Sequence, residues 1–255
     1  MEEIVSAGIV DSFFRKLKEN LSVDVAIAGG GPSGLVAACH LARQGKKVAL
    51  FERKLAPGGG MWGGAMMFNE IIVQKEALYI LDEFGIDYSP YDGDYYTADS
   101  LNASSALIYH ATKAGARIFN CISIEDVVFK NNRVSGIVIN WGPVHREGLH
   151  VDPLIINSRA VIDATGHDCE IARTVERKNN VRLNTETGKV MGEMSLSVDE
   201  AERTTIENTK EIYPGLFVSG MASNGVSGSY RMGPIFGGML LSGEKVARLI
   251  NGQLK

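Results

Sequence analysis

The first fifth of the chain contains segments whose apolar positions differ in spacing. Over residues 3–20, apolar side chains recur about every three to four positions with charged residues between them, which predicts an amphipathic helix packed on a core or on a neighbouring subunit. Residues 23–28 and 47–52 are short apolar runs of the kind found in buried parallel strands. Between them, residues 35–44 have helical spacing and end at Gly45. The two runs and the intervening helix predict a βαβ unit.

The rest of the chain continues this alternation of apolar runs and helical segments. Further helices are predicted near residues 74–84, 100–114, 169–178 and 235–250, and further strands at 117–121, 125–130, 133–141, 160–164 and 216–219. Asn131-Asn132 lies between two of these strands, as in a hairpin. Residues 179–210 have no clear periodicity. The order predicts an α/β protein with one doubly wound, Rossmann-like domain over residues 1–255 and a smaller inserted antiparallel layer at about 117–141.

The composition is that of a globular protein with a small-molecule partner. The 255 residues include 26 basic and 30 acidic side chains, and no basic run favours nucleic acid or an anionic membrane. No apolar run is long enough to span a bilayer, and the N-terminus does not resemble a signal peptide. Cys39, Cys121 and Cys169 form neither a disulfide framework nor a CxxC pattern, which fits a reducing cytosol. We therefore expect a cytoplasmic protein.

A glycine pattern directly follows the first predicted strand. Gly29-x-Gly31-x-x-Gly34 leads into the helix, and Glu52 ends the second strand eighteen residues beyond Gly34. In such loops the first glycine permits the tight turn, the second lets the backbone approach a pyrophosphate, and the third lets the helix pack close to the sheet. The helix amides then face the negative charge, while the carboxylate accepts hydrogen bonds from an adenosine ribose. The alternative is a tight strand–helix turn that binds no ligand.

A second glycine-rich region lies near the end of the chain. Residues 213–220 combine a short apolar strand with two glycines, Gly215 and Gly220, and residues 231–238 lead through further glycines into the last predicted helix. Together with the first glycine pattern, this region resembles the glutathione-reductase-like flavoprotein superfamily. The resemblance implies a glutathione-reductase-like sheet that binds an ADP moiety, but it implies no particular reaction.

Several motifs together resemble the thiamine thiazole synthase family in its archaeal form. They are Glu52-Arg53, Pro57-Gly58-Gly59-Gly60-Met61-Trp62-Gly63-Gly64, Val151-Asp152-Pro153, Thr165-Gly166-His167-Asp168 and Arg231-Met232-Gly233-Pro234, and the resemblance covers the chain from about Asp24 onward. It implies a transferase-type enzyme of thiamine biosynthesis that consumes NAD as a substrate. Glycine and free sulfide are the implied co-substrates, and an ADP-linked thiazole carboxylate is the implied product.

The resemblance also implies which residues bind the substrates. In addition to the three glycines of the first pattern, the residues implied to hold the ADP part are Ser33, Glu52, Arg53, Gly60 and the backbone of Ile124, with Met221 nearer the reacting end. Arg231 is implied to bind the glycine carboxylate, a role that suits the guanidinium fork. The alternative for Arg231 is an ordinary ion pair.

Asp152 and His167 match the metal ligands of the family, and with His150 they are the candidate catalytic residues. A carboxylate and an imidazole with open positions suit Fe(II) or a similar divalent ion, and glycine condensed with the ligand would supply further donor atoms. The resemblance implies that neighbouring subunits complete the site in a homo-oligomer, an octamer. Without the resemblance, an Asp and a His fifteen residues apart are more often unrelated.

His150 is an informative departure from part of the family. Eukaryotic members carry a cysteine two positions before this Asp and give up its sulfur, whereas residues 149–153 here contain no thiol. This matches archaeal members that use free sulfide and turn over repeatedly. His150 would fill space, ligate the metal or shuttle a proton. Cys169 is the alternative sulfur donor, although a small apolar role at a helix start is favoured.

Three rival functions are compatible with the glycine patterns. A FAD-dependent oxidoreductase is the default for this fold, although the chain is short for an isoalloxazine site and a substrate domain. A sugar-phosphate isomerase is the second, because opening and tautomerising ADP-ribose is an aldose–ketose conversion. A non-catalytic NAD-binding module is the third, and the combination of Asp152, His167 and Arg231 argues against it.

Overall fold

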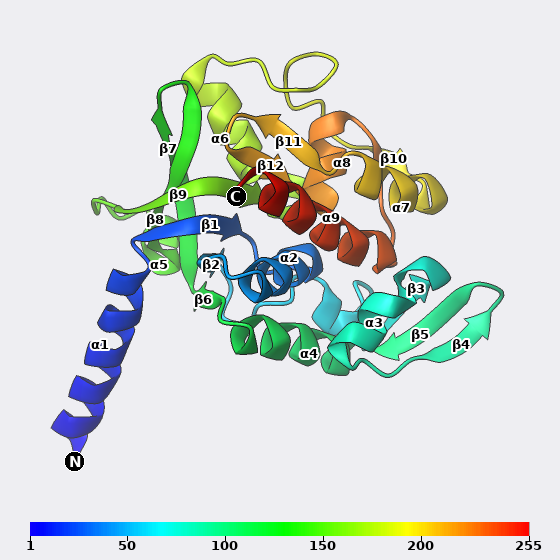
Figure 1. Ribbon diagram of the computed structural model, residues 1–255, viewed down its shortest axis with the longest axis horizontal. Coiled ribbons are helices and arrows are strands. Elements are labelled where there is room, and N and C mark those ends of the chain that lie inside the picture. The colour runs from blue at the N-terminus through cyan, green and yellow to red at the C-terminus, as the bar shows by residue number, and fades with distance from the viewer. Residues whose placement is uncertain (255) are drawn as a thin grey trace.

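The computed structural model describes residues 1–254, and its centre is a mixed eight-stranded sheet (Figure 1). Its main path is β11-β12-β9-β1-β2-β6, where the strands are β11 (Lys210–Tyr213), β12 (Leu216–Val218), β9 (Leu154–Asp163), β1 (Ser22–Ala28), β2 (Val48–Glu52) and β6 (Arg117–Asn120). All neighbours on this path are parallel except β11, which is antiparallel to β12. The predicted doubly wound α/β fold is confirmed.

Helices cover both faces of the sheet because successive residues of its central strand point to opposite sides. Val25 and Ile27 of β1 belong to one apolar cluster, with residues of α2 (Pro32–Arg43), α4 (Ser100–Lys113) and α9 (Gly237–Gln253). Ala26 and Ala28 belong to the other, with residues of α6 (Glu170–Asn179) and α8 (Met221–Ser227). From Val25 to Ala28, β1 is therefore buried on both faces, as its apolar sequence predicts.

The predicted hairpin at residues 125–141 is present, but its relation to the main sheet differs from the prediction. β7 (Ile122–Lys130) and β8 (Arg133–Trp141) are antiparallel, and Asn131 and Asn132 between them have φ of 53° and 55°, as a type I′ turn requires. β8 continues the main sheet by pairing with β9. Residues 117–120 are not part of the antiparallel layer, because they form the parallel strand β6, whose Phe119 stacks on Phe51 of β2.

A separate three-stranded antiparallel sheet was not predicted. It contains β3 (Glu70–Gln74), β5 (Tyr95–Asp99) and β4 (Ser89–Asp92), in the order β3-β5-β4. The helix predicted near 74–84 is consequently shorter and begins after a 3₁₀ turn, as α3 (Leu78–Phe84). Ile71 and Val73 are buried at alternate positions, which is the spacing of a strand. The strand continues to Gln74, the residue at which the helix was predicted to begin.

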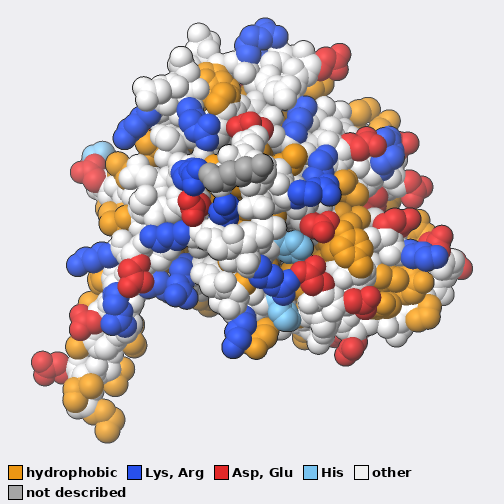
Figure 2. Space-filling model, in the orientation of Figure 1, with side chains coloured by type: hydrophobic (Ala, Val, Ile, Leu, Met, Phe, Trp, Pro, Cys, Tyr) orange, Lys and Arg blue, Asp and Glu red, His pale blue; other side chains and the backbone are white. Residues whose placement is uncertain are grey.

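The predicted N-terminal helix is α1 (Glu2–Glu19), and it stands away from the body (Figure 1). Only Leu17 is buried in it, while Ile4 and Ile9 are 77% and 66% exposed. Figure 2 shows apolar side chains along this projecting helix. Packing on the protein's own core is therefore confined to the end of α1 that joins β1.

Two further helices and two further strands complete the set of α-helices and β-strands in the described residues. They are α5 (Gly142–Arg146), α7 (Val198–Glu207), and the paired short strands β10 (Met194–Leu196) and β13 (Tyr230–Arg231). α7 and β10 lie in the stretch whose sequence has no clear periodicity, and α8 was not predicted at all. No helix within residues 1–254 has the length and apolar character needed to cross a membrane.

Candidate functional site

The chemically interesting residues follow the carboxyl ends of neighbouring parallel strands. In register, Ala28 at the end of β1 pairs with Phe51 of β2 and with Asp163 of β9, and Asp163 pairs with Val218 of β12. The loops that leave these strands therefore meet at one edge. β1 lies where the chain switches from one side of the sheet to the other, the position at which open α/β sheets bind ligands.

A cavity of about 980 Å³ opens at this edge, near the upper end of the range for ligand pockets. It brings together most of the residues predicted from sequence: Gly29, Gly31, Ser33, Glu52, Arg53, Gly60, Ile124, His167, Met221 and Arg231. Gly34, His150 and Asp152 are the predicted residues that do not line it. Residues far apart in sequence thus line the same cavity.

The three glycines of the first pattern have different steric surroundings. A Cβ on Gly29, whose φ is 98°, would lie 2.4 Å from the Ala164 carbonyl oxygen, and a Cβ on Gly34 would lie 2.3 Å from that of Gly29. A Cβ on Gly31 would meet no heavy atom within 4 Å. Gly29 and Gly34 are therefore needed for the fold, whereas Gly31 leaves space in the cavity itself.

This contrast predicts opposite outcomes for two alanine substitutions. Gly31→Ala should change the free energy of unfolding by no more than about 1 kcal/mol. The backbone conformation at Gly31 is one that alanine adopts, and the added methyl group meets no neighbouring atom. The sequence predicts that NAD lies along this loop, so the added methyl group should weaken NAD binding about tenfold or more. Gly34→Ala should instead destabilise the protein by about 1–3 kcal/mol or more through overpacking. Denaturant unfolding and calorimetric NAD titration measure both; unchanged NAD affinity in the Gly31 variant would contradict the assignment.

Glu52 holds the glycine loop in place from the end of β2. Its side chain is buried, Oε2 accepts a hydrogen bond from the Gly30 amide at 2.8 Å, and Oε1 accepts one from the Lys54 amide at 2.8 Å. Carboxylate oxygens have lone pairs beyond these two bonds, so the same group remains able to accept from a ribose hydroxyl. The sequence predicted the ribose contact and missed the support of the loop.

Glu52→Ala should therefore weaken both ligand binding and the fold. We expect NAD affinity to fall by about 1.5–3 kcal/mol, and the free energy of unfolding to fall by about 1–3 kcal/mol because two amides lose their acceptor. Glu52→Gln keeps one acceptor oxygen and should be intermediate in both measurements. Calorimetric titration with NAD would refute the assignment if the alanine variant bound as tightly as the unaltered protein.

Arg53 lies beside two acidic residues that were not predicted as site residues. Its guanidinium forms ion pairs with Asp168 at 3.2 Å and with Glu170 at 2.5 Å, across more than a hundred residues of chain. Burial raises the pKa of the Glu170 carboxyl, and the Arg53 charge partly offsets that shift. The two carboxylates therefore hold Arg53 at the cavity wall.

The loop that carries His167 is anchored by the fully buried Asp163. Its carboxylate accepts hydrogen bonds from the amide and hydroxyl of Thr165 and from the amides of Ile171 and Ala172. Burial raises the pKa of Asp163, and these hydrogen bonds oppose the shift. This role of Asp163 was not predicted, although a polar residue within an apolar strand is a sequence signal for it. Asp163 thus ties both ends of the 165–172 turn to β9.

Cys169 is packed inside the same turn and away from solvent. It is 0% exposed, and its Sγ lies 3.6 Å from the carbonyl oxygens of His167 and Ala222. Burial raises the pKa of the Cys169 thiol, so the nucleophilic thiolate is disfavoured. These surroundings support the predicted structural role.

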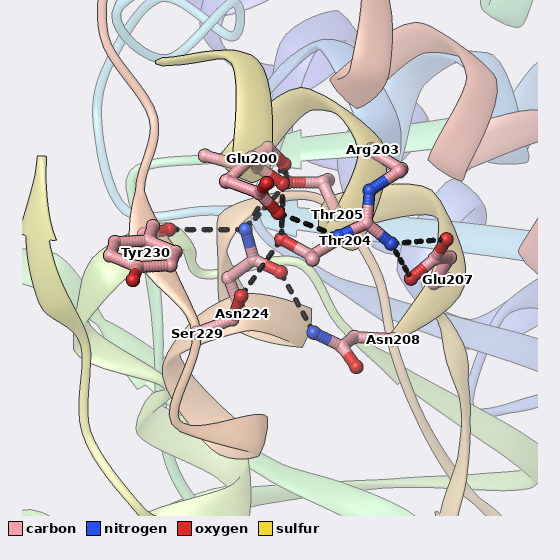
Figure 3. Close-up of polar contacts among 10 residues, drawn as sticks. Glu200, Arg203, Thr204, Thr205, Glu207, Asn208, Asn224, Ser229 and Tyr230 are labelled. Atoms are coloured by element: carbon pink, nitrogen blue, oxygen red, sulfur yellow. Dashed lines mark hydrogen bonds and ion pairs between the residues drawn. The ribbon is translucent and has the colours of Figure 1, made fainter. Parts of the chain in front are cut away.

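A hydrogen-bond network centred on the buried Asn224 holds Tyr230, the residue next to Arg231 (Figure 3). The Asn224 side-chain amide donates to Thr205 Oγ1, to the Ala201 carbonyl and to the Tyr230 carbonyl, and its oxygen accepts from Asn208. α7 and α8 are thereby joined to β13, which carries Arg231. The Arg231 guanidinium has no hydrogen-bond or ion-pair partner among the described residues. Its fork is therefore available to an anionic ligand in the cavity.

His150 and Asp152 lie in an exposed loop between α5 and β9. Neither side chain has a hydrogen-bond or ion-pair partner within residues 1–254. A single protomer therefore does not bring Asp152 into the cavity that His167 lines. Over the same residues, no three His, Cys, Asp or Glu side chains are grouped as metal ligands.

Comparisons with known proteins agree with the motifs. A model of the Thi4 family matches residues 6–236. A thiamine thiazole synthase from Desulfosudis oleivorans is 58% identical over 100% of this chain and 98% of its own length, and one from Methanothermobacter thermautotrophicus is 57% identical over 98% and 97%. The crystal structure of Thermovibrio ammonificans THI4 has a TM-score of 0.98 and 52% identity, over 100% of this chain and 98% of that one. The chain belongs to the Thi4 family, as its sequence motifs predict.

Proposed function

We propose that this protein is a thiamine thiazole synthase that forms an ADP-linked thiazole carboxylate from NAD, glycine and free sulfide with Fe(II). The observation that carries the proposal is a cavity lined by the glycine loop that follows β1, by Arg231 and by His167. The relatives named above, matched over nearly their full lengths, support the overall activity. The chemistry of the residues that line the cavity supports the proposed identity of the individual substrates.

The reaction would begin with loss of nicotinamide from NAD bound along the glycine loop. Ring opening and tautomerisation of the ADP-ribose give a ketone, glycine condenses with it to an imine, and sulfide addition with loss of water closes the thiazole. Arg231 would hold the glycine carboxylate, because its unpaired guanidinium offers two parallel donors. Arg53, held by Asp168 and Glu170, would bind the ADP part.

Asp152 and His167 would hold the Fe(II), a divalent ion that accepts oxygen and nitrogen donors. The donor chemistry fits, because Asp152 is an exposed carboxylate free of other partners in the described chain and His167 is half exposed at the cavity. When bound, the metal supplies Lewis-acid chemistry to the condensation and sulfur-addition steps.

A second copy of the chain would bring Asp152 to the cavity. The loop around Asp152 is flanked by apolar side chains that are open to solvent, among them Leu149 and Ile155 at 57% and 54% exposure. The cavity rim has exposed apolar side chains of its own, Met66, Met194 and Leu196. Clustered exposed apolar side chains are typical of interaction surfaces. They support a homo-oligomer, which we propose to be an octamer, with each site shared between subunits.

Mass spectrometry of the ligand released from purified protein tests the proposed function. We expect an ADP-thiazole or a glycine adduct of ADP-ribulose. Visible flavin absorbance with a matching FAD mass would contradict the proposal, and so would an enzyme that makes no thiazole from NAD, glycine, sulfide and Fe(II) under anaerobic conditions.

A further inference from the structure

Glu193 forms a close contact with His167 that no sequence motif indicates. The Glu193 Oε1 atom lies 2.7 Å from His167 Nδ1, and both residues line the cavity. The Glu193 side chain is 17% exposed and the His167 side chain 47% exposed. The carboxylate is therefore largely withdrawn from water, whereas the imidazole remains accessible.

The backbone around Glu193 is fixed on both sides. Gly192 donates its amide to the Gly225 carbonyl of α8 at 2.9 Å, and Met194 donates to the Ser229 carbonyl at 2.9 Å. Three residues further on, the Ser197 amide donates to the carbonyl of Arg231 at 3.2 Å. The backbone around Glu193 is thus anchored to α8 and to the segment that carries Arg231.

The contact decides which nitrogen of His167 is free to bind a metal. A carboxylate only accepts hydrogen bonds, so a neutral His167 carries its proton on Nδ1 and has its lone pair on Nε2. Metal-binding histidines commonly donate their other N–H to a carboxylate, which fixes the ring and raises the basicity of the ligating nitrogen. We propose that Glu193 is a positioning residue that holds His167 as an Nε2 ligand for the divalent metal. This inference rests on the proposed metal role of His167.

Anaerobic Co(II) titration with a competing chelator, in the presence of NAD and glycine without sulfide, tests the proposal by affinity and by the Co(II) absorption spectrum. Glu193→Ala should weaken Co(II) binding about 10- to 100-fold and alter the spectrum. Glu193→Gln should retain most of the affinity, because its carbonyl oxygen still accepts the Nδ1–H bond. Glu186→Ala is the matched control, since it removes an exposed negative charge from the same part of the chain, and it should leave Co(II) binding unchanged.

The outcomes separate this inference from the proposed function. His167→Ala should weaken Co(II) binding at least as much as Glu193→Ala; if it has no effect, the proposed metal site and the positioning role both fail. If His167→Ala weakens binding but Glu193→Ala does not, only the positioning role fails. Equal losses in Glu193→Ala and Glu193→Gln would also overturn it, because Glu193 would then act through its charge or as a ligand itself. Unchanged NAD affinity in all variants establishes that the cavity is intact.

Discussion

Oligomers assembled from a mixture of Asp152→Ala and His167→Ala chains should form thiazole, although neither variant does so alone. Each substitution removes one proposed Fe(II) ligand, so each pure variant should lose bound iron and activity in anaerobic preparations. In a mixed oligomer, a site that takes His167 from the first variant and Asp152 from the second has both ligands. The exposed loop of Asp152, which does not line its own protomer's cavity, is the reason to expect this sharing.

Co-expression of the two variants with different affinity tags, followed by tandem purification, provides the mixed oligomer. Random assortment leaves about one site in four intact if each site is shared by two subunits. Thiazole formation and iron content should rise to about that fraction of the level in the unaltered protein. An oligomer that carries Asp152→Ala in every chain is the control and should remain inactive. A mixed oligomer as inactive as the pure variants would place both ligands in one chain, and a pure variant with full iron and activity would place the metal elsewhere.

The unaltered protein should complete many turnovers per subunit when it is given NAD, glycine, Fe(II) and sulfide without oxygen. No thiol lies beside Asp152, where His150 stands, and the described structure buries Cys169 within the turn that follows β9. Mass spectrometry of the protein after the reaction should therefore find no dehydroalanine and no loss of a sulfur atom. Thiazole formed per subunit, measured against added sulfide, gives the turnover number.

Cys169→Ser separates a structural from a sulfur-donating role. The hydroxyl replaces a buried thiol in contact with two carbonyl oxygens, so the variant should keep its sulfide-dependent activity and lose about 1–2 kcal/mol of unfolding free energy. His150→Cys is the complementary change and should create a single-turnover donor if its thiol reaches the imine. One thiazole per subunit without added sulfide, abolished by Cys169→Ser, would instead identify Cys169 as the donor.

Local rules explain why the dinucleotide half of the site is predictable. Gly29, Gly31 and Gly34 lie within six residues. The positive φ of Gly29 and the close approach of Gly34 to the Gly29 carbonyl are local requirements, whereas Gly31 leaves open space in the cavity. Parallel pairing then brings the ends of β1 and β2 together, so Glu52 is placed beside the same loop. The family resemblance adds His167 and Arg231, and the structure places both at the cavity wall.

The sequence alone determined the βαβ unit, the glycine loop and the hairpin at Asn131-Asn132, because turn chemistry and apolar spacing act between near neighbours. Only the tertiary structure decided that residues 117–120 extend the parallel sheet, that Glu193 contacts His167, and that Asp152 lies outside the cavity. These facts depend on contacts between segments far apart in the chain, which no periodicity records. The stretch that carries Glu193 is held by backbone hydrogen bonds to α8 and β13. Because nearly every residue has the same backbone donor and acceptor, these bonds leave no pattern in the sequence from which they could be predicted.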